Sequence, residues 1–291
     1  MKNICFFLLL FFFPFVGLSS APFSRFTGKQ AEWKGFQKTT FKVGEYEAFV
    51  VQPKRTAEGK PWVWRARFPT FHSEIDEMLL ADGYHVAHIN AGKRLGSPTA
   101  LNIWKQFYDL LTEKHGLNKK VVLEGVSRGG LYVYRWAKAY PETVACIYND
   151  TPVCDLKSWP GGMGVGKGAQ REWKRVIVEY GFKNEGEAIA YKDNPIDHLQ
   201  PLVDARIPIM HIITEDDAIV PAKENTYVLK EGLEKLGHPI FYVISIDKGS
   251  RANGHHFDVK YPHVGYHFIR KYSDFSNEYP IYLRSGLKNS Q

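Results

Sequence analysis

The fold is decided by the stretch Val121-Val-Leu-Glu-Gly-Val-Ser-Arg-Gly-Gly130, in which a short apolar run leads into a glycine-flanked serine. The apolar residues at 121–123 predict a buried strand, and the largely apolar residues at 131–139 predict a helix. In Gly125-Val-Ser-Arg-Gly129 a side chain in place of either glycine would collide with the neighbouring strand or helix if the turn is tight. The stretch therefore predicts a strand, a sharp turn and a helix, with Ser127 held at the turn in a strained conformation.

The rest of the chain repeats this alternation of strand and helix. Strands are expected at 61–67, 84–89, 144–149, 207–213 and 239–246, and helices at about 73–83, 100–115, 222–236 and 262–272. Residues 41–53 predict a hairpin of edge strands that turns at Gly44-Glu45, and the residues before about Thr40 are interpreted as a polar segment. Alternation with short connections favours an α/β fold, with a mostly parallel central sheet and helices on both faces.

Residues 155–206 interrupt this rhythm with a glycine-rich stretch and two polar helical pieces, which predicts a small helical cap insertion in a single domain spanning 22–291. The cap contains four large aromatic residues, namely Trp159, Trp173, Tyr180 and Tyr191. Aromatic faces stack on sugar rings, and aromatic residues in a cap also serve as packing. Both interpretations stay open.

The first 21 residues differ from the rest. One lysine precedes an apolar run from Ile4 to Phe13, and Pro14 and several small residues up to Ala21 follow. This order is typical of a secretory signal peptide, and the run is short beside the roughly 20 apolar residues of a membrane span. We expect a secreted or periplasmic protein with no membrane association after cleavage. The alternative is an uncleaved N-terminal anchor.

The bulk composition excludes some functions. The 291 residues carry a formal net charge of +7, spread along the chain, so we expect no nucleic-acid partner. The histidines and cysteines show no metal-ligand spacing, and we expect neither a metal nor a cofactor. After export, Cys146 and Cys154 either form a disulfide or remain separate, with Cys146 as a buried thiol on a strand. The oligomeric state is not predicted.

A serine hydroxyl is a poor nucleophile at neutral pH unless a base takes its proton, and that base needs an orienting partner. Three acids, Glu215, Asp216 and Asp217, follow the strand at 207–213, and His255-His256 follow the strand at 239–246. In a parallel sheet, active-site residues collect at the carboxyl ends of strands. The chain order serine, acid, histidine is one of the orders in which catalytic triads of these three residue types occur.

At this point the chain resembles the α/β-hydrolase superfamily over nearly its whole length after the signal segment. The resemblance is carried by Gly125-Val-Ser-Arg-Gly129, Asp217-Ala-Ile-Val-Pro221 and Gly254-His255. It implies Ser127 as nucleophile, Asp217 as the triad acid and His255 as the base. Asp150 is the rival acid because some members use that position, and His256 is the rival histidine.

The pattern departs from many lipases and esterases, because Arg65-Ala-Arg-Phe-Pro69 occupies the place of their His-Gly-Gly oxyanion loop. We expect the oxyanion hole to use the backbone amide of Arg128 and a second amide near Arg67 or Phe68, with Phe68 preferred. Arg65, Arg67 and Arg128 all lie close to the predicted cleft, and arginine forks suit carboxylate or sulfate groups. Arg65 and Arg67 are therefore predicted to bind an acidic substrate. The alternative is that these arginines form structural ion pairs with Glu124, Asp150 or other acids.

These expectations combine into one functional hypothesis. The protein is predicted to be a secreted serine hydrolase that cleaves carboxylic esters through an acyl-enzyme, with a small-molecule or polysaccharide ester, acylated or methyl-esterified, as substrate. A serine peptidase of the same superfamily is the second enzymatic hypothesis. The third is a non-catalytic binding protein that keeps the fold.

Overall fold

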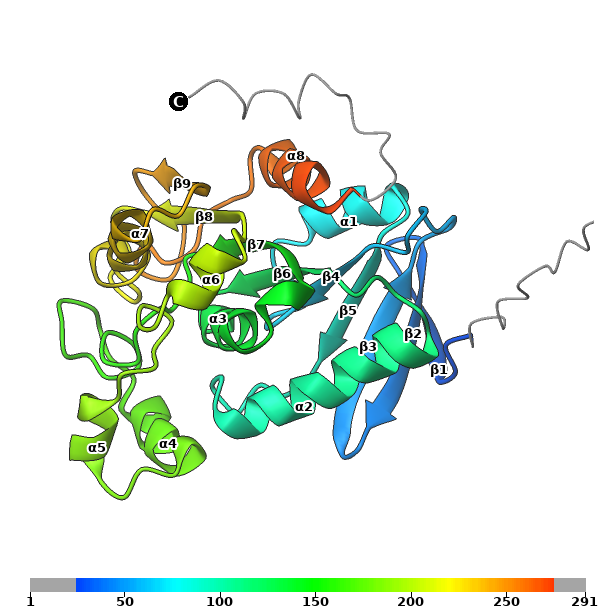
Figure 1. Cartoon of the computed structure of the whole chain (residues 1–291). Helices are drawn as coiled ribbons and strands as arrows, with labels where there is room; N and C mark the ends of the chain where they lie inside the picture. The colour runs from blue at the N-terminus through cyan, green and yellow to red at the C-terminus, as the bar shows by residue number, and fades with distance from the viewer. Residues whose placement is uncertain (1–24, 275–291) are drawn as a thin grey trace, which may run out of the picture.

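A computed structural model describes residues 25–274 of the chain (Figure 1). The signal peptide predicted for residues 1–21 lies outside the described residues. In chain order the elements are β1 (Lys29–Trp33), β2 (Phe36–Val43), β3 (Tyr46–Gln52), β4 (Trp62–Arg65), α1 (Glu74–Ala81), β5 (His85–Ile89), α2 (Pro98–Asp109), the π-helical turn η1 (Leu110–Lys114), β6 (Val121–Val126), α3 (Gly129–Ala139), the 3₁₀ turn η2 (Pro141–Thr143), β7 (Val144–Asp150), α4 (Gln170–Tyr180), α5 (Glu185–Ala190), α6 (Gln200–Asp204), β8 (Ile209–Thr214), the 3₁₀ turn η3 (Ala222–Glu224), α7 (Thr226–Lys235), β9 (Phe241–Ile246) and α8 (Pro262–Ser273).

The strands form one sheet in the order β1-β2-β3-β5-β4-β6-β7-β8-β9. Every neighbouring pair from β5 to β9 is parallel, whereas β1, β2, β3 and β5 are joined by antiparallel pairing. This confirms the predicted α/β architecture with a mostly parallel sheet. Strands β4, β6, β7, β8 and β9 are consecutive in the sheet, so the loops at their carboxyl ends lie along one edge.

Helices cover both faces of the sheet. One face packs under α1 and α8, with core residues such as Leu79, Tyr148 and Phe268. The other face packs under α2, α3 and α7, with a larger core that includes Trp64, Trp104 and other aromatic rings. The separation is visible in Figure 1, where α1 and α8 lie on one side of the strands and α2 and α3 on the other. Burial on both faces explains why the central strands are continuous apolar runs.

The N-terminal edge differs from the sequence prediction. The predicted hairpin forms between β2 and β3, with Val43 opposite Tyr46, but β2 already begins at Phe36 and a further strand, β1, precedes it. The residues of β1, Lys-Gln-Ala-Glu-Trp, are exposed or half-buried. An edge strand that faces water on both sides shows no alternation of apolar and polar residues, so the pattern gave no signal.

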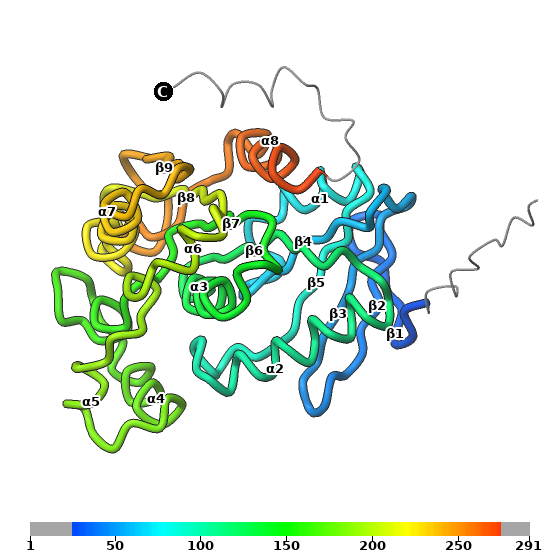
Figure 2. Tube along the Cα trace, in the orientation of Figure 1, coloured from blue at the N-terminus to red at the C-terminus, as the bar shows by residue number. Residues whose placement is uncertain are grey.

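The chain leaves the sheet after β7 and returns to it with β8. Figure 2 shows α4 and α5 standing away from the sheet, and α6 leading back towards α3. The two cysteines in the described residues, Cys146 and Cys154, are buried free thiols. Between residues 25 and 274, no helix has the length and apolar character that crossing a membrane requires.

Candidate active site

The turn after β6 holds Ser127 in a strained backbone conformation. Its φ of 54° lies in the left-handed region, which is costly for a residue with a side chain. Three backbone hydrogen bonds fix it there: the Ser127 amide donates to the Asp150 carbonyl at 2.9 Å, and the Ser127 carbonyl accepts from the amides of Gly130 and Val153. The serine therefore lies at the carboxyl end of β6, just before α3.

The crowding predicted for the two glycines around this turn is confirmed for Gly125 and wrong for Gly129. A Cβ atom on Gly125 would lie 2.2 Å from Asn149 Oδ1, as the tight turn requires. A Cβ on Gly129 would be no closer than 3.5 Å to its nearest neighbour, which is ordinary contact. A Cβ on Gly130 would lie 2.6 Å from the Val153 carbonyl. The glycine expected at 129 for close packing is needed one residue later, because the chain after β7 passes over Gly130.

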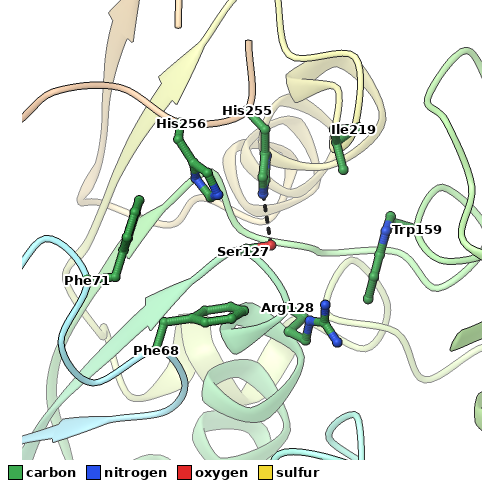
Figure 3. A pocket seen from close by; sticks show the side chains of 8 residues that line it. All are labelled: Phe68, Phe71, Ser127, Arg128, Trp159, Ile219, His255 and His256. Carbon is green, nitrogen blue, oxygen red and sulfur yellow. Dashed lines mark hydrogen bonds between the residues drawn. The ribbon is translucent and has the colours of Figure 1, made fainter. Parts of the chain in front are cut away.

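Three side chains from three loops form a hydrogen-bonded chain. His255 Nε2 lies 2.8 Å from Ser127 Oγ, and His255 Nδ1 lies 2.6 Å from Asp217 Oδ2. Figure 3 shows the His255 ring directed at the serine oxygen. Asp217 follows β8 and His255 follows β9, so the parallel sheet brings together residues that are far apart in the sequence. The ring lies between a carboxylate and a hydroxyl, the arrangement in which an imidazole can accept a proton from the hydroxyl.

The three neighbouring acids have separate hydrogen-bond partners. Asp217 Oδ1 accepts from the amides of Ile219 and Val220, both at 2.8 Å, which fixes its other oxygen towards His255. Asp216 accepts from the amide of Gly249 at 2.7 Å, and Glu215 accepts from Tyr227 at 2.5 Å. Asp217 is the acid of the three that reaches the histidine.

Asp150, the rival acid, has a different partner. Its Oδ2 lies 2.8 Å from His72 Nδ1, and His72 Nε2 lies 2.8 Å from the carbonyl of Phe257. His72 thus connects the end of β7 to the loop that carries His255. The sequence analysis missed His72; its position shortly after a predicted strand, near the expected oxyanion loop, was the available signal.

A cavity of about 290 Å³ opens over Ser127. Its lining consists of Phe68, Phe71, Ser127, Arg128, Trp159, Ile219, His255 and His256, which Figure 3 shows around the serine. Trp159 comes from the predicted cap, whereas Trp173 is buried and donates to Glu185 instead. Between residues 25 and 274, no group of three or more His, Cys, Asp or Glu side chains is arranged to hold a metal ion.

His256 lies beside the hydrogen-bonded histidine rather than on the serine. Its ring centroid is 4.6 Å from that of His255 and 4.6 Å from that of Phe71. Burial, together with the neighbouring His255 and His72, lowers the pKa of His256 to about 4. His256 is therefore a neutral wall of the cavity at neutral pH.

The two residues predicted to supply the oxyanion hole both line the cavity. Arg128 directly precedes α3, so its amide belongs to the N-terminal end of that helix, where backbone N–H groups favour negative charge. Phe68 has a φ of 50°, and its carbonyl accepts from Arg65 Nη2 and from the amide of Phe71. Within residues 25–274, neither amide donates a hydrogen bond to another protein group.

Arg65 was predicted to bind substrate, and the structure contradicts this. Its side chain is completely buried and lies 2.7 Å from Asp76 and 2.8 Å from Glu124. Burial by itself lowers the pKa of Arg65, but these two carboxyl groups raise it above its ordinary value. The guanidinium also donates to the carbonyls of Phe68, Phe71 and His72. Arg65 thus holds the 68–72 loop by hydrogen bonds to its carbonyls and does not line the cavity.

Arg67 lies near the site but outside the cavity lining. Its guanidinium carbon is 4.8 Å from the centroid of the Phe68 ring. The Arg67 side chain also lies near Asn90 and Gly92, which follow β5 in the chain. No hydrogen bond or ion pair of its side chain occurs within residues 25–274. The structure therefore separates two arginines that the sequence analysis treated alike.

No protein-family model matches the chain, and no curated protein matches it in sequence. Solved structures do match. An uncomplexed acylaminoacyl peptidase of Pyrococcus horikoshii is similar with 16% identity and a TM-score of 0.62, over 85% of this chain and 43% of that one. A puromycin-hydrolyzing peptidase of Mycobacterium tuberculosis is similar with 14% identity and a TM-score of 0.54, over 69% of this chain and 33% of that one. Dipeptidyl peptidase 4 of Porphyromonas gingivalis is similar with 14% identity and a TM-score of 0.53, over 72% and 31%.

These matches confirm the fold predicted from the sequence, which is that of the α/β-hydrolase superfamily. The aligned part spans less than half the length of each of these three proteins. At such low identity the similarity extends to the fold alone. The activity of this chain depends on the residues of its own site.

Proposed function

We propose that the protein is a serine hydrolase in which Ser127 is the nucleophile, His255 the general base and Asp217 the residue that orients it. The observation that carries this proposal is the hydrogen-bonded chain from Ser127 Oγ through His255 to Asp217 Oδ2, at 2.8 and 2.6 Å, at the wall of a cavity. A buried carboxylate facing Nδ1 keeps the proton there, which leaves Nε2 free to accept the serine proton.

The mechanism proposed has two halves. Ser127 Oγ attacks the carbonyl carbon while its proton passes to His255 Nε2, and the carbonyl oxygen becomes an oxyanion. The amide of Arg128 stabilises that oxyanion together with an amide from the 67–68 segment, for which Phe68 is our choice. The intermediate collapses, the leaving group takes the proton from His255, and an acyl-serine remains. Water, deprotonated by His255, then releases the acid and restores Ser127.

For the substrate we propose a carboxylic ester, and a carbohydrate ester as the natural class. Support comes from Trp159, whose indole lines the cavity where a sugar ring could stack. Because such polymers lie outside the cell, this proposal goes together with export through the segment at 1–21. The mass of the protein recovered from its native host tests export, since the absence of cleavage near Ala21 would contradict it.

A serine peptidase is the second candidate, and the structural neighbours favour it. The three proteins compared above are all described as peptidases. The two candidates differ in the leaving group, since an amine must be protonated by the histidine before it departs. A matched ester and anilide of the same acyl group therefore separate them.

The test compares wild type with Ser127→Ala. Substrates are p-nitrophenyl acetate and butyrate, acetylated and methyl-esterified polysaccharides, dipeptide p-nitroanilides, and a matched pair made of the p-nitrophenyl ester and the p-nitroanilide of the same N-acyl amino acid. Release of acetate or methanol from the polysaccharides that depends on Ser127 supports the esterase. Cleavage of the matched p-nitroanilide at a kcat/KM comparable to that of its ester supports the peptidase. If neither substrate is cleaved and a fluorophosphonate fails to label Ser127, a non-catalytic binding protein replaces both candidates.

A further inference from the structure

Two arginines lie against the ring of Phe68, which lines the cavity. The guanidinium carbon of Arg67 is 4.8 Å from the ring centroid, and that of Arg128 is 5.7 Å from it. Arg128 also lies 4.9 Å from the centroid of Trp159. Arg128 is therefore held between two aromatic side chains of the cavity wall, next to Ser127, as Figure 3 shows.

The positive charge of these arginines is poorly compensated. Within residues 25–274 the carboxylate in ion-pair range of Arg128 is Glu172, at 3.8 Å. That same carboxylate lies 2.6 Å from Arg175 and 3.4 Å from Arg171, so three guanidinium groups share one negative charge. Arg67 has no carboxylate partner within the described residues. The Nε atoms of Arg67 and Arg128 are also buried without a hydrogen-bond acceptor, but so is Nε of Arg65, and the difference between these arginines lies in their carboxylate partners.

Arg65 shows what a structural arginine looks like in this protein. It lies within 2.8 Å of two carboxyl groups and donates to backbone carbonyls, so its charge and most of its donors are satisfied. Arg128 keeps about a quarter of its side chain exposed, and it lines the cavity beside Ser127. An arginine remains charged at neutral pH, and a partly buried guanidinium is stabilised most by an anion that accepts two parallel hydrogen bonds.

We propose that the cavity selects substrates that carry a carboxylate, and that the Arg128 side chain binds this group while Ser127 attacks the neighbouring acyl carbon. Arg67 adds to the positive potential from behind Phe68. The inference rests on the proposed hydrolase function and narrows its substrate class to acidic esters or amides. Arg128 then serves twice, with its amide at the oxyanion and its guanidinium at the substrate anion.

The test uses two pairs of substrates that differ in charge but hardly in shape. In the first pair the charge is on the acyl side: mono-p-nitrophenyl glutarate and its neutral amide, p-nitrophenyl 4-carbamoylbutyrate. In the second pair it is on the leaving group: 3-carboxyphenyl acetate and 3-carbamoylphenyl acetate. For each pair the readout is the ratio of kcat/KM for the anionic ester to that for the neutral ester. Damage to the oxyanion hole lowers both rates and cancels in this ratio.

We expect wild type to prefer the anionic member of at least one pair by about 10-fold to 100-fold, the range of a charge-assisted hydrogen bond. Arg128→Gln should bring that ratio to near one, and Arg128→Lys should keep part of it because the charge remains without the fork. The matched control is Arg171→Gln, which removes another guanidinium beside Glu172. Because that side chain is 87% exposed, its loss should change the ratio less than twofold.

Three results would overturn the inference. A wild-type ratio of one or less in both pairs, with Ser127-dependent hydrolysis of the neutral esters, leaves the hydrolase standing and removes the anion site. An unchanged preference in Arg128→Gln assigns the selectivity to other groups. If no ester is hydrolysed and no fluorophosphonate labels Ser127, the proposed function fails and this inference falls with it.

Discussion

His255 and Ser127 are 128 positions apart in the chain, and their side chains meet at 2.8 Å between Nε2 and Oγ. His255 lies in the loop between β9 and α8, and the Thr214 hydroxyl holds this loop by donating to the Gly254 carbonyl. The histidine is therefore positioned by the neighbouring strand β8, whose end also supplies Asp217.

Removing either member of this pair should abolish turnover. We expect Ser127→Ala and His255→Ala each to lower kcat by about 10⁴-fold or more, because the nucleophile and its base act as a unit. His256→Ala should cost less than about tenfold, since that ring lines the cavity without touching the serine. The measurement is steady-state hydrolysis of whichever substrate wild type cleaves. A large loss in His256→Ala with near-normal turnover in His255→Ala would reverse the histidine assignment.

Substitution of the two candidate acids, Asp217 and Asp150, should lower kcat to very different extents. Asp217→Asn keeps the shape but no longer stabilises the imidazolium, so we expect kcat to fall by about 10⁴-fold. Asp150→Asn can still hydrogen-bond to His72 and should reduce kcat by less than about 30-fold, as an indirect effect on the loop near Phe257. Parallel kinetics of the two variants decide the question. Equal losses would mean that Asp150 has a direct part in catalysis.

Arg65 should matter for stability rather than for substrate. Arg65→Met leaves Asp76 and Glu124 buried without their cation, which typically costs about 3–5 kcal/mol. Urea denaturation measures the free energy of unfolding. Arg171→Met serves as the control, because its exposed side chain should change the midpoint little. An Arg65→Met protein as stable as wild type, but with a raised KM, would restore Arg65 as a substrate-binding residue.

Two adjacent glycines should respond in opposite ways to the same substitution. Gly130→Ala places a methyl group 2.6 Å from the Val153 carbonyl, which is backbone and cannot move aside cheaply. Gly129→Ala meets its nearest atom at 3.5 Å and improves helix propensity at the start of α3. We expect Gly130→Ala to unfold at a clearly lower temperature than wild type and Gly129→Ala to be unchanged or slightly stabilised. Thermal melts by circular dichroism check this, and equal effects would contradict the local packing described here.

Buried neutral histidines should make stability depend on pH. Burial lowers the pKa of His85 and of His88 to about 4, and that of His211 to about 3. Since an unfolded histidine titrates near 6.5, the unfolded state binds more protons at these three positions between pH 6.5 and 4. The contribution of these histidines to the free energy of unfolding therefore falls as the pH falls through that window. Each such group contributes about 1.4 kcal/mol per pH unit there.

Urea denaturation of wild type and His85→Asn at several pH values tests this linkage. The variant lacks one titrating ring, so its stability should fall less steeply by about 1.4 kcal/mol per pH unit. The comparison also removes the contributions of other groups, such as Glu124, whose pKa is raised by burial. Identical slopes in the two proteins would show that His85 titrates normally in the folded state.

Much of the fold could be read from the sequence because its signals are local. The apolar strands, the glycine-flanked Ser127 and the order of strand and helix follow from periodicity and turn chemistry within short windows. The pattern also narrowed the acid to Asp217 or Asp150 and the histidine to His255 or His256. Strand β1 escaped detection because a water-exposed edge strand carries no apolar alternation.

Which of these side chains meet depends on how the elements pack in three dimensions. From the sequence, Arg65, Arg67 and Arg128 were all expected near the cleft. Packing buries Arg65 between two carboxyl groups, whereas Arg128 lines the cavity. The packing also places Asp150 in hydrogen-bond contact with His72, and Asp217 in hydrogen-bond contact with His255. Local sequence signals were enough to predict the elements and the reactive residues that they carry, because backbone preferences act over a few residues. The partners of each charge depended on long-range packing, in which side chains far apart along the chain compete for the same space and hydrogen bonds.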